Sequence, residues 1–169
     1  FGAGQRWASD GWAAQVLGDC TVAGIFTAES GAPFTVALLP EIDNSNTGRA
    51  ALGFGANDRP NLSGNATLAN PSAGAWFDTE AFAFPAFGSF GNAGRNILDG
   101  PGYQNLNLAV LKLASLSEGV NLQFRLEAFN VLNRVNLGLP DAFLGSPTFG
   151  RILTAGPARR LQLGVKLIY

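Results

Sequence analysis

The chain has 169 residues, of which 47% are hydrophobic and only 14% are charged, and its net charge is −1. A charge close to zero gives no electrostatic reason to expect nucleic acid as a partner. The single cysteine and the lack of histidine exclude a disulfide framework, a Ser-His-Asp triad and histidine metal ligands. Soluble proteins are about 25% charged, and no apolar run reaches the ~18–20 residues of a membrane helix. The composition therefore leaves two classes, a secreted all-β protein and a membrane β-barrel.

Four segments alternate apolar and polar residues with the period of a β-strand. Each has about the 9–11 residues of a tilted barrel strand, and they lie at 20–28, 104–114, 119–130 and 160–169. The first is mixed on both faces. The third alternates most regularly, because its apolar even positions oppose the polar Asn121, Gln123, Arg125 and Glu127. Such alternation suits a wall between lipid and water, so we expect an all-β fold, an antiparallel transmembrane β-barrel segment of about four strands.

The connections between these segments differ in length. Residues 115–118 form a hairpin-scale turn, whereas 29–103 and 131–159 are long. Transmembrane barrels have short periplasmic turns and long extracellular loops. If the carboxyl terminus at Tyr169 is periplasmic, both long connections are extracellular.

The longer loop is rich in aromatic residues, which disordered segments lack. We therefore expect it to pack on itself or on neighbouring loops. Core filling is the expected role of these aromatic residues, and a ligand-contact surface is the alternative; they are Trp76, Phe77, Phe82, Phe84, Phe87 and Phe90.

The last strand segment places apolar residues at every second position and ends in an aromatic residue. It resembles the carboxy-terminal sorting signal of bacterial outer-membrane barrels. That signal has a polar residue, a glycine two positions later, and apolar or aromatic residues at the third-last and last positions. These places hold Gln162, Gly164, Leu167 and Tyr169. From this strand alone, a solvent-backed edge strand of a soluble sheet is an equally good interpretation.

Motifs along nearly the whole chain resemble Oar-like TonB-dependent transporters of the outer membrane. They are SGAPFTV (30–36), DNSNTG (43–48), RPNL (59–62), WFDTEAF (76–82), FGNAGRNILDGPG (90–102), FRLEAFNVLN (124–133), NLGLP (136–140) and FGRI (149–152). The resemblance implies the last four strands of a barrel of about 22 strands. Its TonB box, plug domain and amino-terminal carboxypeptidase-regulatory-like domain would precede Phe1, so we expect a piece of a longer protein. The chain departs from the family at Arg134-Val135, where members often carry His-Pro, which puts a role for that loop tip in doubt.

The inward polar residues of the strands are the candidate site residues. We expect them to face the barrel lumen and contact the plug, with simple solvation of the interior as the alternative; they are Asn105, Asn107, Gln123, Arg125, Glu127, Gln162 and Lys166. No catalytic, cofactor or metal site is expected. The segment 43–48 partly matches a calcium loop, but the twelfth position holds Phe54 instead of a bidentate Glu, so we expect a polar turn. Asp78 and Glu80 form a local carboxylate pair without partners suited to catalysis.

The sequence thus predicts part of a TonB-dependent transporter or receptor in the bacterial outer membrane, which imports a large or scarce solute and is not an enzyme. The partners that the resemblance implies are outer-membrane lipid, the barrel assembly machinery, the plug and remaining strands of the full-length protein, and TonB. The alternative is a secreted β-sandwich binding module without transport activity. A hydrolase that uses a carboxylate pair is a third, weaker hypothesis.

Overall fold

The computed structural model describes residues 18–48 and 57–169. The chain divides into two compact units. The sheet unit comprises 18–28, 104–135 and 157–169, and the loop unit comprises 29–48, 57–103 and 136–156. All regular secondary structure in these residues is β-strand, which confirms the predicted all-β fold. No helix in the described ranges is long and apolar enough to span a membrane.

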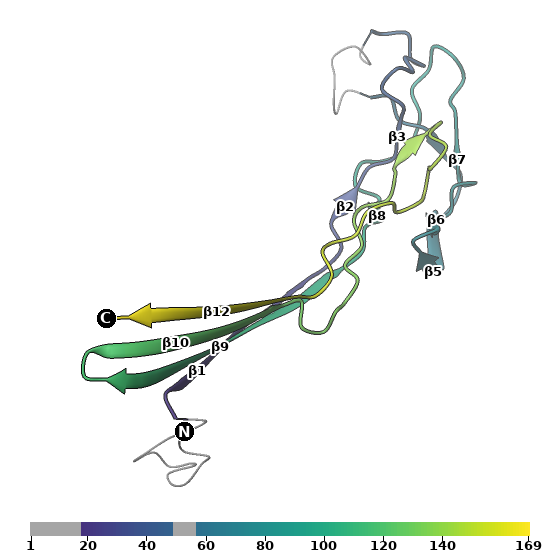
Figure 1. The fold of residues 1–169 in the computed structure, drawn as a ribbon. Helices are drawn as coiled ribbons and strands as arrows, with labels where there is room; N and C mark the ends of the chain where they lie inside the picture. The colour runs from purple at the N-terminus through teal and green to yellow at the C-terminus, as the bar shows by residue number, and fades with distance from the viewer. Residues whose placement is uncertain (1–17, 49–56) are drawn as a thin grey trace. The chain divides into compact units, whose positions relative to one another are not determined.

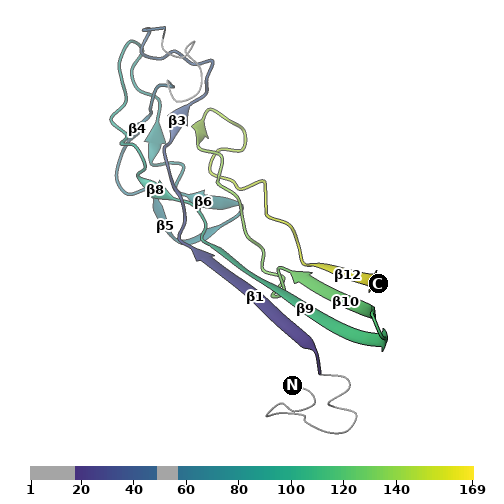
Figure 2. The ribbon, with the colours of Figure 1, turned by 90° about the vertical axis from the view of Figure 1, so that its left-hand side faces the viewer.

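The sheet unit is built on four long strands, which Figures 1 and 2 show side by side. They are β1 (Cys20–Glu29), β9 (Tyr103–Ser117), β10 (Val120–Phe129) and β12 (Arg160–Ile168), hydrogen-bonded in the order β1-β9-β10-β12. Both pairings of β10 are antiparallel. Successive long strands are therefore neighbours in a meander, as expected for an antiparallel barrel wall.

The hairpin between β9 and β10 is tighter than the sequence predicts. β9 continues to Ser117 instead of ending at 114, so the expected four-residue turn at 115–118 is wrong and only Glu118 and Gly119 connect the strands. Gly119 has a φ of 80°, and two-residue hairpin turns need such left-handed residues. The pairing register shifts between Val120 and Asn121, directly after this turn.

The strand register collects apolar side chains on one face of the sheet. Leu126 on β10 lies opposite Val110 on β9 and Leu163 on β12. Because strand residues alternate between faces, the polar residues of β10 and β12 all lie on the other face, to which β9 contributes Leu111 and Leu113. We call these the apolar face and the polar face.

One basic residue interrupts the apolar face. Lys112 lies opposite Phe124, which in turn lies opposite Val165 on β12. The Lys112 Nζ donates to the Gly18 carbonyl at 2.6 Å, just before β1 begins. The aliphatic stem therefore stays on the apolar face while the ammonium group reaches the end of the neighbouring strand, as long basic side chains commonly do.

Both faces of this sheet are open, since no residue of its four strands is buried. Leu163 is 82% exposed and Val165 is 67% exposed. Each square ångström of apolar surface left in water costs roughly 25 cal/mol relative to burial. The strands β1 and β12 form the edges of the sheet, and unpaired backbone groups at such edges need partners inside a membrane. The apolar face thus fits lipid, and the edges fit the neighbouring strands of a larger barrel.

The loop unit is held by four short strand pairs. Three are antiparallel, β2 (Pro33–Phe34) with β8 (Leu98–Asp99), β4 (Asn61–Leu62) with β7 (Phe82–Ala83), and β5 (Thr67–Ser72) with β6 (Ala75–Phe77). The fourth is parallel, β3 (Ala37–Leu38) with β11 (Phe143–Leu144), and adds a hydrogen bond from the Ala37 N–H to the Ala142 carbonyl at 3.0 Å. This last pair joins the two long connections of the sheet, so they form one ordered unit.

Aromatic residues form the core of the loop unit, with Phe77 at its centre. The Phe77 ring is 2% exposed, and its centroid lies 5.7 Å from those of Phe34 and Phe82 and 5.2 Å from that of Phe149. The predicted core role is therefore confirmed for Phe77 and Phe82. It is wrong for the three aromatic residues that follow, which are 49–79% exposed, namely Phe84, Phe87 and Phe90.

Candidate functional site

The residues that the sequence predicts to face the lumen share the polar face of the sheet. Gln123 lies opposite Lys166, and Glu127 lies opposite Gln162, with Arg125 between them on β10. The Arg125 Nη2 lies 2.5 Å from the Glu127 Oε1. Because the Arg125 side chain is 53% exposed, this ion pair contributes only about 0–1 kcal/mol. The structure brings these side chains together on one surface, and their position in a lumen stays a prediction.

Asn105 and Asn107 continue the polar face along β9, because they lie four and two residues before Ala109, which lies opposite Glu127. The Asn105 Nδ2 donates to the Asn107 Oδ1 at 3.1 Å, and the Asn130 N–H donates to the same oxygen at 3.0 Å. Within 18–48 and 57–169, the Asn105 Oδ1 is the single buried side-chain nitrogen or oxygen without a hydrogen-bond partner. The Asn105 amide is therefore the least satisfied group of this face.

The residues that resemble the sorting signal lie in β12 and directly after it. Gln162 and Gly164 lie on the polar face, and Leu167 lies on the apolar face. Tyr169 follows the end of the strand and is 96% exposed. Recognition of this terminus by the assembly machinery stays a prediction.

The acidic residues considered for calcium binding or catalysis instead stabilise local turns. The Asp43 carboxylate accepts hydrogen bonds from the N–H groups of Thr47 at 3.2 Å and Gly48 at 2.8 Å. The Asp78 Oδ1 accepts one from the Glu80 N–H at 3.0 Å. Phe54, the twelfth position of the calcium-loop match, lies outside the described residues. In the part of the chain that the structure describes, no three His, Cys, Asp or Glu side chains are grouped to hold a metal ion.

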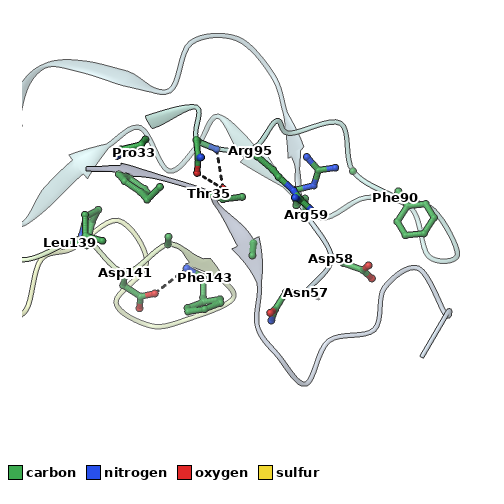
Figure 3. Close-up of a pocket in the computed structure, with 16 residues that line it drawn as sticks. Pro33, Thr35, Asn57, Asp58, Arg59, Phe90, Arg95, Leu139, Asp141 and Phe143 are labelled. Atoms are coloured by element: carbon green, nitrogen blue, oxygen red, sulfur yellow. Dashed lines mark hydrogen bonds between the residues drawn. The ribbon is translucent and has the colours of Figure 1, made fainter. Parts of the chain in front are cut away.

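The loop unit contains a pocket with a volume of about 950 Å³. Figure 3 shows its lining residues, which come from four segments within 33–37, 57–59, 90–96 and 139–143. Small-molecule sites in proteins commonly have volumes of ~300–1,000 Å³. The pocket is therefore large enough for a small solute.

One wall of the pocket is fixed by hydrogen bonds between the segments 59–62 and 91–93. The Asn92 Oδ1 accepts from the Leu62 N–H at 2.6 Å, and the Asn92 N–H donates to the Asn61 Oδ1 at 3.2 Å. Gly91 allows this close approach, because a Cβ there would lie 2.2 Å from the Pro60 carbonyl oxygen. Larger residues at Gly91 would push the two segments apart.

The opposite wall is organised around the Asp141 carboxylate. Its Oδ2 accepts hydrogen bonds from the hydroxyls of Ser146 and Thr148, the latter at 2.6 Å, and its Oδ1 accepts from the Phe143 N–H at 3.0 Å. Burial raises the pKa of the Asp141 carboxyl, but these three hydrogen bonds together outweigh burial and lower the pKa from its ordinary value of 3.8. Asp141 is thus a charged residue whose oxygens hold the wall in place.

The remaining charged residues of the pocket are two arginines and a second aspartate. The Arg59 Nη1 donates to the Ala93 carbonyl at 2.7 Å. The Arg95 side chain is exposed and makes no hydrogen bond or ion pair with the described residues. Asp58 is 4% exposed, and its two carboxylate oxygens accept hydrogen bonds from the N–H (2.7 Å) and hydroxyl (3.0 Å) of Ser45.

Sequence reasoning did not find this pocket. Arg59 and Arg95 lie in two of the segments that carry the family resemblance, 59–62 and 90–102, and Leu139 lies in a third, 136–140. The concentration of family-like motifs in these loops was the available signal. The sequence did not show that the three segments meet.

Comparison with known proteins identifies the family. Residues 1–162 match the profile described as "Outer membrane beta barrel domain". The chain therefore belongs to this family of outer-membrane β-barrel domains, and its place is the bacterial outer membrane. No curated protein and no solved structure matches the chain.

Proposed function

We propose that the chain is the carboxy-terminal barrel segment of an Oar-like TonB-dependent transporter, which imports a large or scarce solute. The observation that carries this proposal is the four-stranded meander, which has an exposed apolar face, a polar opposite face and one two-residue turn. The two long connections between these strands form the loop unit. The motifs shared with Oar-like transporters support the transporter class over other outer-membrane barrels.

In this proposal the apolar face contacts lipid and the polar face lines the lumen, where it meets the plug. The Glu118-Gly119 turn is periplasmic, and the loop unit is extracellular. TonB acts through the amino-terminal part of the full-length protein, and the barrel assembly machinery recognises the terminus at Tyr169. We propose a role in binding and transport, without catalysis and without nucleic acid as a partner.

The openness of the sheet argues against a secreted β-sandwich module. A sandwich packs one face of each sheet into a core about 10 Å thick. Here no residue of β1, β9, β10 or β12 is buried, and the apolar face carries Leu161, Leu163 and Val165, each more than 60% exposed. A soluble sheet would lose a large hydrophobic contribution in this state.

Two measurements on the full-length protein test the proposal. A folded barrel should sediment with outer membranes and migrate faster on a detergent gel before heating than after it. A transporter of this class should also co-purify with the periplasmic domain of TonB, and deletion of its TonB box should abolish co-purification. Heat-modifiable migration without any TonB binding would support a membrane barrel but refute the proposal that it is a TonB-dependent transporter.

A further inference from the structure

We propose that the pocket of the loop unit binds a small solute that joins an anionic group, a carboxylate or a phosphate, to a ring-sized apolar body. The inference that this ligand is the transported solute rests on the function proposed above. Binding itself does not rest on it, because all the described lining residues of the pocket belong to the loop unit.

The anionic end is assigned from the state of the two pocket arginines. A guanidinium group has five N–H donors in a planar fork, which matches the oxygens of carboxylate and phosphate. Arg59 uses one donor on a neutral carbonyl, and Arg95 uses none on the described residues. Most of the donors that these two side chains bring to the pocket are therefore available to a ligand.

The carboxylates of the pocket do not neutralise these arginines through ion pairs. Among the described residues the only ion pair is Arg125–Glu127, which lies in the sheet unit. Both oxygens of Asp58 and both oxygens of Asp141 already accept hydrogen bonds from neighbouring Ser, Thr or backbone groups. An entering anion would meet two guanidinium groups that form no ion pair with the described residues, and two carboxylates held by other donors.

The apolar body is assigned from the side chains around these charges. Phe90 is 60% exposed and Leu139 is 51% exposed although both line the pocket, together with Phe143, Pro33 and Pro140. Figure 3 shows the rings of Phe90 and Phe143 among the lining residues. An exposed Phe ring that lines the same pocket as a guanidinium suits an aromatic ligand, since the ring buries apolar area while the arginine holds the charge.

The backbone around Arg95 is fixed before any ligand arrives. Two residues earlier, the Ala93 N–H donates to the Pro60 carbonyl at 3.1 Å and the Ala93 carbonyl accepts from Arg59. One residue later, the Asn96 N–H donates to the Thr35 hydroxyl at 2.9 Å. A ligand would therefore order one side chain rather than a loop, which lowers the entropic cost of binding.

The test measures binding of three fluorinated probes to the full-length protein in lipid nanodiscs by ¹⁹F NMR, with empty nanodiscs as the background. The probes are 4-fluorobenzoate, 4-fluorophenyl phosphate and the neutral 4-fluorobenzamide. We expect at least one anionic probe to bind ~10-fold or more tightly than the amide. The tighter of the two anions identifies the group that the pocket prefers.

Variants locate the binding to this pocket. Arg95→Gln removes a guanidinium that has no partner among the described residues, so the fold should persist while the preference for the anion over the amide falls to about twofold or less. Phe90→Ala should weaken anion and amide by a similar factor. Arg151→Gln is the matched control, because Arg151 is exposed in the same unit but does not line the pocket.

The proposal is overturned if neither anion binds, if the amide binds as tightly as both anions, or if Arg95→Gln leaves the preference unchanged. Loss of binding in Arg151→Gln to the same extent as in Arg95→Gln would also overturn it. None of these outcomes depends on TonB, so a failure here is separate from a failure of TonB co-purification.

Discussion

Two neighbouring residues of β9 should respond oppositely to a positive charge. Val110 lies opposite Leu126 on the apolar face, whereas Ala109 lies opposite Glu127 on the polar face. We predict that Val110→Arg strongly destabilises the full-length barrel and that Ala109→Arg is tolerated. The two variants insert the same side chain one residue apart, so each is the other's control.

The position of Val110 sets the expected magnitude. It is the middle residue of β9, which has 15 residues and at ~3.3 Å per residue and a tilt of ~40° spans roughly 38 Å. The apolar band of an outer-membrane barrel is only about 25 Å tall, so Val110 should lie close to its centre. An arginine on the lipid face there costs roughly 2–4 kcal/mol. Ala109→Arg places the guanidinium beside a carboxylate and should change stability by less than about 1 kcal/mol.

Denaturant titration of the full-length protein, folded into lipid bilayers, would measure both free energies of unfolding. Val110→Leu serves as the apolar control and should stay near wild type. Equal effects of the two arginines would refute a lipid face at Val110. A reversed order would mean that the register is wrong by one residue, since such a slip exchanges the faces.

Three further predictions concern single residues. The Asn130 side chain accepts a hydrogen bond from the Arg134 N–H and donates to the carbonyls of Arg134 and Pro157. Asn130→Ala should therefore destabilise the segment that follows β10 by about 1–3 kcal/mol, seen as faster hydrogen exchange there. Unchanged exchange would contradict this role. The lowered pKa of Asp141 implies a stabilisation of the loop unit that is present above the ordinary pKa of 3.8 and is lost as the pH falls through the folded value. Hydrogen-exchange protection of 139–151 in the wild type and in Asp141→Asn should therefore converge in acid, and a constant difference at all pH values would refute it. Tyr169→Asp should abolish accumulation of the full-length barrel in the outer membrane, and wild-type levels of this variant on membrane fractionation would disprove the sorting role of the terminus.

The strands and their faces could be predicted from the sequence because their pattern is local. A membrane wall requires alternation at every second residue, and the segment from Val120 to Ala128 keeps it without a break. The predicted end of β9 was wrong because the residues 115–117 contain no Gly, Pro, Asn or Asp, whereas Gly119 has the positive φ that suits the tight connection.

The loop unit could be predicted only in part because its contacts are distant in sequence. Aromatic content indicated an ordered unit, but composition alone could not separate the buried Phe77 from the exposed Phe90. The pocket depends on the parallel pairing of Ala37 with Phe143, which brings two different connections together. No periodic pattern marks such a pairing.

The central claim is that the four-stranded sheet is an outer-membrane barrel wall with lipid on its apolar face. Spin labels placed one at a time along 161–168 of the full-length protein, with Cys20 replaced by Ser, would test it by collision with oxygen and with a water-soluble nickel complex in bilayers. We predict oxygen collision maxima at Leu161, Leu163, Val165 and Leu167, with weaker access at the even positions between them. Uniform access of the nickel complex along β12, or oxygen maxima at Gln162 and Lys166, would contradict the claim.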